Sequence, residues 1–136
     1  MSTVRDLVKD RKVYSVDAGR TVLEAARLMM EHNFGALPVL RDGELAGIFS
    51  ERDLMNRVVA VGRTPAHTAV SEVMTPNPRA VGLDESIEEC LFIMHEFGFR
   101  HLCAVEGKEL KGLVSLRDIL MQQAGELQRQ SRRAAS

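Results

Sequence analysis

The chain has 136 residues, of which 45% are hydrophobic and 27% are charged, and its 18 Lys and Arg against 19 Asp and Glu leave a formal net charge of −1. A chain of this length can bury one hydrophobic core without disulfides or metals. Its near-zero charge argues against nucleic acid or an anionic membrane as partner, and its longest apolar runs are much shorter than the about 18 residues that a membrane-spanning helix requires.

The chain contains an internal duplication. An offset of 65 residues aligns 21–55 with 86–120 without a gap, and 11 of the 35 pairs are identical. At an offset of 66, residues 4–7 resemble 70–73, so each copy also starts with a lead-in arm. The two halves of the chain are therefore predicted to fold alike.

Both copies predict the same elements in the same order. An extended piece leads to a capping box, Thr21-x-x-Glu24 or Ser86-x-x-Glu89, and an amphipathic helix follows. A β-hairpin around a Gly-containing turn and a closing helix complete each copy. The elements are expected at about residues 13–16, 22–33, 36–40, 45–49 and 51–61 in the first copy, and at about 79–81, 87–97, 101–105, 110–114 and 116–127 in the second.

This repeated β-α-β-β-α order predicts an α+β fold of two repeats. Each repeat has a small sheet with one open apolar face, so we expect the two sheets to pack against each other about a pseudo-twofold axis. The grooves between the repeats are the expected ligand sites. The predicted organisation is a first repeat with its N-terminal arm at 1–62, a linker at 63–69, a second repeat at 70–128 and a flexible C-terminal tail at 129–136.

The closing helix of each copy follows the most similar repeated string, Gly47-Ile-Phe-Ser-Glu-Arg-Asp53 in the first and Gly112-Leu-Val-Ser-Leu-Arg-Asp118 in the second. A helix N-terminus with a hydroxyl and a guanidinium offers donors to phosphate oxygens. The Asp carboxylate instead accepts hydrogen bonds, such as the two that a ribose diol donates. Together these groups predict nucleotide sites at Ser50, Arg52 and Asp53 and at Ser115, Arg117 and Asp118.

A purely structural role for the same residues stays open, because Ser-x-x-Asp before an apolar run also fits a helix cap. Two observations favour a functional role. A cap needs neither Arg52 nor Arg117, and the two other capping boxes of the chain use Glu where these strings have Asp.

The doubled unit, the Leu37-Pro38-Val39 strand and the Gly-hydrophobic-x-Ser-x-x-Asp string resemble a tandem pair of cystathionine-β-synthase (CBS) domains over nearly the whole chain. The resemblance implies repeats packed through their sheets, a flat homodimer, and clefts for adenosine-containing ligands such as AMP, ATP, NAD(H) or S-adenosylmethionine. It also implies that the two Asp residues bind the ribose and that the two Ser residues lie near ribose or phosphate. The residues implied to frame the base are Val16, Ala36, Leu37, Pro38 and Val39 in the first copy, and Thr75, Pro78, Val81, His101, Leu102, Cys103 and Ala104 in the second.

Two departures make the copies unequal. Cys103 stands where the first copy has Pro38, so the second strand gains an N–H donor that alters how its backbone meets a base. The second copy has Arg100 and His101 where the first has Gly35 and Ala36, and in the family such a basic pair often points at a nucleotide phosphate. Because Arg100, His101, Arg52 and Arg117 would form a positive pocket, we expect a phosphorylated ligand, AMP above all, rather than the sulfonium of S-adenosylmethionine.

The remaining residues indicate neither a metal site nor catalysis. The histidines and cysteines lack metal-ligand spacing, and no activated nucleophile is visible. The leading hypothesis is an adenine-nucleotide sensor that needs no cofactor and acts on an unknown effector protein; the alternatives are a ligand-free protein-interaction module and an enzyme acting on nucleotides. The first residues lack the apolar core of a signal peptide and cysteine is sparse, so we expect a cytoplasmic protein.

Overall fold

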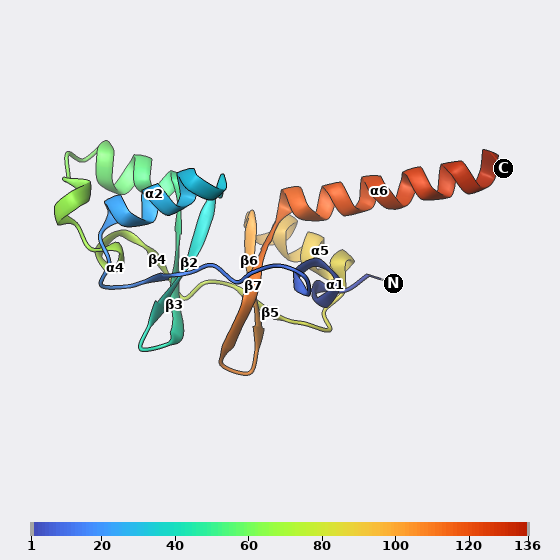
Figure 1. The fold of residues 1–136 in the computed structure, drawn as a ribbon, viewed down its shortest axis with the longest axis horizontal. Helices are drawn as coiled ribbons and strands as arrows, with labels where there is room; N and C mark the ends of the chain where they lie inside the picture. The colour runs from blue at the N-terminus through green and yellow to red at the C-terminus, as the bar shows by residue number, and fades with distance from the viewer. Residues whose placement is uncertain (1, 136) are drawn as a thin grey trace.

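The structure is a computed structural model that describes residues 2–135 (Figure 1). Two similar halves follow each other along the chain, and each contains a β-hairpin between helices. The elements of the first half are α1 (Val4–Val8), β1 (Val16–Asp17), α2 (Val22–His32), β2 (Ala36–Arg41), β3 (Glu44–Ser50), α3 (Glu51–Asp53) and the π-helix η1 (Leu54–Val59). Those of the second are the 3-10 helix η2 (Pro65–His67), α4 (Val70–Val73), β4 (Thr75–Pro76), β5 (Ala80–Gly82), α5 (Ile87–Phe97), β6 (His101–Glu106), β7 (Glu109–Ser115) and α6 (Leu116–Ala135).

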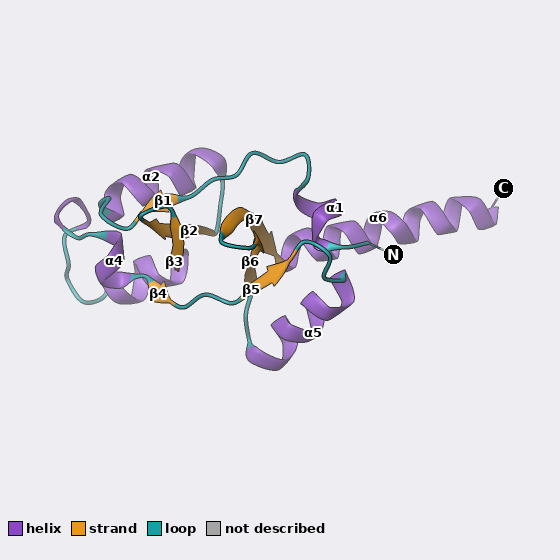
Figure 2. Cartoon of the chain, turned by 90° about the horizontal axis from the view of Figure 1, so that it is seen from below, coloured by secondary structure: helices purple, strands orange, loops and turns teal. Residues whose placement is uncertain are grey.

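The strands form two small sheets, with orders β1-β2-β3-β4 and β5-β6-β7. In both sheets the first strand is parallel to the second, and the hairpin is antiparallel. Its register shifts at equivalent places, between Val39 and Leu40 and between Ala104 and Val105. The two hairpins lie side by side, and each sheet carries its own helices (Figures 1 and 2). The prediction of an α+β fold of two repeats packed through their sheets is confirmed.

The short lead-in helices are exchanged between the repeats. Val4, Leu7 and Val8 of α1 belong to the hydrophobic core of the second repeat, whereas Val70 and Val73 of α4 belong to that of the first. Backbone hydrogen bonds hold each exchange, because the Val4 N–H donates to the Glu85 carbonyl at 2.9 Å and the Val70 N–H to the Arg20 carbonyl at 2.8 Å. The sequence predicted the two arms but not that each arm packs on the opposite repeat.

The exchange explains the glycine in each repeated string. A Cβ at Gly47 would lie 2.6 Å from Met74 Sδ and 2.8 Å from the Thr75 carbonyl oxygen, and a Cβ at Gly112 would lie 3.0 Å from Val8 Cγ1. In both cases the neighbour comes from the arm of the other repeat, which packs directly against the strand. Any larger residue would push this arm away.

The closing helices depart from the prediction in both repeats. In the first repeat, the expected closing helix over about 51–61 is present, but its residues Leu54–Val59 form a π-helix. In the second, the closing helix is longer than the predicted 116–127, because α6 continues to Ala135 and its last part extends away from the body (Figure 1). The stretch has no proline and consists mostly of good helix formers, which explains its continuation without packing. Ser136 lies outside the described residues.

The extra N–H donor of the second hairpin has a structural partner. Cys103 occupies the position of Pro38, and its N–H donates to the Arg79 carbonyl at 2.9 Å, next to the parallel pairing of β5 with β6. This donor therefore extends the sheet contact. Proline at the same place in the first repeat has no N–H to offer.

Candidate functional site

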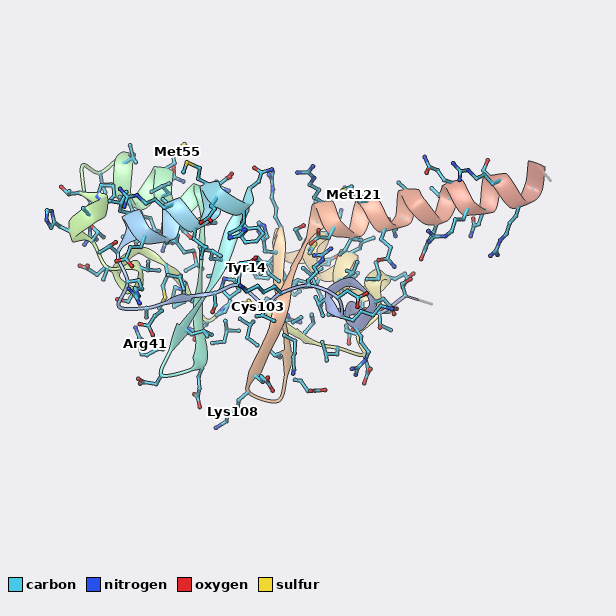
Figure 3. All side chains as sticks on the ribbon, viewed as in Figure 1. Tyr14, Arg41, Met55, Cys103, Lys108 and Met121 are labelled. Carbon is cyan, nitrogen blue, oxygen red and sulfur yellow. The ribbon has the colours of Figure 1, made fainter. Side chains whose placement is uncertain are left out.

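A cavity of about 640 Å³ lies where the second repeat's Ser-x-Arg-Asp string meets the arm and first hairpin strand of the first repeat. We call it the central cavity; its volume is in the range of small-molecule sites. Figure 3 shows Tyr14 near the junction of the two repeats and Met121 at the start of α6, and both residues line this cavity. Its other lining residues include Val8, Arg11, Lys12, His32, Phe34, Gly35, Ala36, Leu37, Pro38, Glu51, His101, Leu113, Ser115, Arg117 and Asp118.

The N-terminus of α6 places Ser115 and Asp118 on the cavity wall. The Ser115 N–H donates to Asp118 Oδ2 at 3.0 Å, and the Asp118 N–H donates to Ser115 Oγ at 3.0 Å, which is a reciprocal helix cap. Asp118 Oδ2 also accepts a hydrogen bond from Arg11 Nη1 at 3.0 Å. The carboxylate is therefore held both by its own helix and by the arm of the other repeat.

The contacts of Asp118 favour its ionised form. Partial burial raises the pKa of this carboxyl, but the hydrogen bonds from Arg11 and Ser115 and the charge of Arg11 outweigh the burial and lower the pKa below its usual value. Asp118 thus presents a negatively charged acceptor to the cavity at neutral pH.

The equivalent residues of the first repeat form a closed group, which we call the Asp53 cluster: Ser50, Asp53, Arg57 and Thr75. Asp53 Oδ2 accepts from the Ser50 N–H at 3.0 Å and from Ser50 Oγ at 3.1 Å, and Oδ1 accepts from Thr75 Oγ1 at 3.2 Å. Arg57 Nε lies 3.6 Å from Oδ1 and its Nη1 donates to the Met74 carbonyl at 3.1 Å. Both carboxylate oxygens are thus engaged inside the protein.

The two carboxylates also differ in exposure. The Asp53 side chain is 8% exposed and the Asp118 side chain is 26% exposed. Asp53 is one of two buried polar or charged residues in the described part of the chain, with Thr68 as the other. A ligand can reach Asp118 from the central cavity, whereas Asp53 is covered by Thr75 and its neighbours.

The structure brings together some of the predicted site residues and separates others. Those that line the central cavity are Ala36, Leu37, Pro38, His101, Ser115, Arg117 and Asp118. Others lie in the two hydrophobic cores, namely Val16, Val39, Val81, Leu102 and Ala104. Arg100 lines a shallower neighbouring groove with Arg117. The remaining residues, Ser50, Arg52, Asp53, Thr75 and Pro78, are not among those lining either space.

The cations of the central cavity differ from the predicted set. Arg117 is present as expected, but Arg52 is exposed elsewhere, and Arg11 and Lys12 take part instead. Burial lowers the pKa of His101; the charges of Asp118 and Glu51 oppose this shift, and Arg100 adds to it. The positive charge of the cavity therefore comes from arginine and lysine of both repeats rather than from His101.

Sequence reasoning missed the residues that the first arm contributes. Tyr14 packs against His32 and Phe34, with ring centroids 4.4 and 5.0 Å apart, and Lys12 Nζ lies 5.3 Å from the centroid of the Tyr14 ring. The offset of 66 that matches the two arms could have found this segment, since it aligns residues 9–12 with 75–78, where a base contact was predicted.

The thiols and histidines do not form a reactive or metal-binding site. Cys90 and Cys103 are free and buried; burial raises the pKa of the first to about 11 and of the second to about 12. Residues 2–135 contain no group of three or more His, Cys, Asp or Glu placed to hold a metal. No helix in this part of the chain is long and apolar enough to span a membrane.

Comparison with known proteins identifies the family. The CBS domain family profile matches residues 4–60 and again residues 70–125, so the chain is a tandem pair of CBS domains and belongs to that family. Proteins built from such a pair are generally regulatory modules. The prediction of the family from the repeated strings is confirmed.

Individual relatives are similar over most of their length. The chain is 37% identical over 123 residues to the CBS domain-containing protein YhcV of Bacillus subtilis. The aligned region covers 90% of this chain and 86% of that protein. A CBS-domain structure from Burkholderia ambifaria is 35% identical with a TM-score of 0.83, covering 89% of this chain and 93% of the other. The structure of a hexameric CBS-CP12 protein from bloom-forming cyanobacteria is 26% identical with a TM-score of 0.79, covering 88% of this chain and 70% of the other.

Proposed function

We propose that this protein is an adenine-nucleotide sensor that binds its ligand, AMP above all, in the central cavity. The observation that carries the proposal is the placement of an ionised carboxylate, Asp118, among Ser115, Arg11 and Arg117 on one cavity wall. A carboxylate suits the ribose diol, and the hydroxyl and guanidinium groups suit a phosphate. Tyr14 and Met121 line the same cavity without being buried, and their side chains suit the base.

This proposal assigns one nucleotide site rather than two. The first repeat's Ser50 and Asp53 already bond to each other and to Thr75. A ribose there would have to displace a hydrogen bond that holds the two repeats together. The Asp53 cluster therefore acts as a structural contact, and the predicted site at Arg52 and Pro78 is not carried into the proposal.

The output of the sensor is a change in the arrangement of the repeats that an effector protein reads. A ligand shifts this balance only by its different affinity for the two arrangements, so the module needs neither a further cofactor nor catalysis of its own. The central cavity suits such a role because the first repeat's arm and the second repeat's helix N-terminus meet in it.

The functional unit in this proposal is a homodimer in the cytoplasm. Large apolar side chains are exposed on the helices of both repeats, and Met55 and Leu120, which occupy equivalent positions, are 59% and 53% exposed. Further exposed apolar residues are Val59, Phe92, Met121 and Leu127. A second copy would cover this surface, and the hexameric CBS-CP12 relative shows that such a fold assembles in another protein.

A thermal-shift titration tests the nucleotide site. Nucleotide-free protein is heated with AMP, ADP, ATP, NADH or S-adenosylmethionine; a ligand at 100 times its Kd adds about 2.7 kcal/mol to the free energy of unfolding. We expect AMP to raise the Tm, Asp118→Asn to abolish the rise, and the matched variant Asp53→Asn to keep it. No shift with any of the five ligands contradicts the proposal. Recovery of intact nucleotide after long incubation excludes turnover.

A second function, a protein-interaction module without ligand, is favoured by one specific observation. Both Ser-x-x-Asp strings form complete helix caps, so each residue already has a structural role. Under this function Asp118→Ala costs about 0.5–2 kcal/mol of stability as a lost cap, and no nucleotide changes the Tm. The titration above separates the two functions.

A further inference from the structure

Arg11 occupies the carboxylate that the proposed function assigns to the ribose. It lies between α1, which packs in the core of the second repeat, and β1, which belongs to the first repeat's sheet. Its Nη1 donates to Asp118 Oδ2 at 3.0 Å across a sequence separation of 107 residues. The two side chains are 47% and 26% exposed, so this ion pair lies at the accessible edge of the central cavity.

A ribose diol and Arg11 compete for the same atom. A diol that donates two hydrogen bonds to one carboxylate uses both oxygens, and Oδ2 of Asp118 already accepts from Arg11 and from the Ser115 N–H. A diol that bonds to both oxygens therefore displaces Arg11, since the Ser115 N–H is fixed by the helix cap. A neutral nucleoside would leave the guanidinium without its anionic partner and would lose the energy of this partly exposed ion pair.

A phosphate on the ligand gives Arg11 a new anionic partner. Guanidinium groups bind phosphate through paired, charge-assisted hydrogen bonds at least as well as they bind a carboxylate. The phosphate of a nucleotide whose ribose sits on Asp118 would enter a cavity that Arg11 itself lines. Arg11 can then exchange one anion for another without losing an ionic partner.

We propose, building on the nucleotide site proposed above, that Arg11 is the specificity-determining residue of the central cavity: it releases Asp118 to the ribose and transfers to the phosphate of the ligand. The cavity thereby selects ligands that carry both a vicinal diol and a phosphate, such as nucleoside monophosphates. It discriminates against neutral nucleosides, which break the Arg11–Asp118 pair and provide no anion for Arg11.

Lys12, another cation of the cavity, serves as a control because it lies in a different position from Arg11. Lys12 Nζ lies over the Tyr14 ring at 5.3 Å from its centroid, and its neighbour Arg11 makes the hydrogen bond to Asp118. Lys12 can attract a phosphate but does not compete with the diol. Loss of its charge should weaken nucleotide binding without helping a nucleoside.

Calorimetric titration of AMP and adenosine into the wild-type protein, Arg11→Gln and Lys12→Gln tests the exchange. We expect wild type to favour AMP, and Arg11→Gln to bind AMP about tenfold more weakly, the size of one lost charged hydrogen bond, while binding adenosine more tightly. Lys12→Gln should weaken the binding of AMP and leave the binding of adenosine unchanged. Circular dichroism melting checks that each variant folds.

The outcomes separate this inference from the function on which it rests. If wild type binds neither AMP nor adenosine, the nucleotide site itself fails and the exchange fails with it. If wild type binds AMP and Arg11→Gln weakens the binding of AMP and of adenosine by the same factor, Arg11 only supports the structure of the cavity. If wild type binds both ligands equally well, Arg11 does not discriminate. The latter two results overturn the exchange while leaving the site in place.

Discussion

The two Ser-x-Arg-Asp strings differ in what the opposite arm does to them. In the first repeat, the arm places the Thr75 hydroxyl on Asp53, and the π-helix adds Arg57, so the carboxylate is enclosed. In the second repeat, the arm places Arg11 on Asp118 at the edge of a cavity. The same residues therefore act as a structural contact in one repeat and as a candidate ligand site in the other, because their neighbours come from distant parts of the chain.

The largest expected difference between the repeats concerns stability. Asp53→Ala should lower the free energy of unfolding by about 2 kcal/mol, because it removes a helix cap and the partly buried hydrogen bonds from Ser50 and Thr75. Asp118→Ala should cost about 1 kcal/mol, since water can replace its lost contacts. Urea unfolding of both variants measures the difference. Equal costs would contradict the assignment of Asp53 as the enclosed member of the pair.

The glycines of the two strings provide a second test of the difference between the repeats. Gly47→Ala should cost about 2–3 kcal/mol, because its Cβ would lie 2.8 Å from the carbonyl oxygen of Thr75, which cannot move without shifting the arm. Gly112→Ala should cost somewhat less, about 1–2 kcal/mol, because its Cβ would lie no closer than 3.0 Å to Val8 Cγ1 and 3.2 Å to Val8 Cβ, while its φ of 159° adds some strain for an L residue. Thermal unfolding of the pair checks the order. A larger loss in Gly112→Ala would show that the second crossing is the tighter one.

The smallest effect is the pH dependence that Asp118 contributes. Its pKa is lowered from 3.8 in the folded protein, so the carboxyl adds stability that is fully present above about pH 5 and is lost as the pH falls below 3.8 through the folded pKa. The stability difference between wild type and Asp118→Asn should therefore shrink on acidification. Urea unfolding of both proteins from pH 6 to pH 2.5 measures it. A difference that grows with falling pH would contradict the ionic contact with Arg11.

Much of the fold could be predicted from local patterns. The duplication, the capping boxes at Thr21 and Ser86, and the alternating strands around Gly-containing turns each depend on residues close in sequence, and the structure has the corresponding helices and hairpins. The π-helix after Asp53 was not predictable in this way. It accompanies the hydrogen bond from Arg57 to the Met74 carbonyl, which requires α4 to pack on the first repeat.

The candidate site was predicted only in part, for a related reason. The sequence identified Ser115, Arg117 and Asp118, because a helix N-terminus with these side chains is a local feature. It did not identify Arg11, Lys12 or Tyr14, which reach the same cavity from an arm about one hundred residues away. A local pattern carries no information on which distant segment will cross it.

Residues close together in the chain were thus enough to predict two similar α+β repeats, their family and the two Ser-x-Arg-Asp strings at helix N-termini. Which string is enclosed and which faces a cavity depends on contacts between distant segments. The physical reason is the exchange of the arms: burial of α1 in the second core and of α4 in the first brings Arg11 to Asp118 and Thr75 to Asp53. The energy of that burial, rather than any local preference, sets the surroundings of each carboxylate.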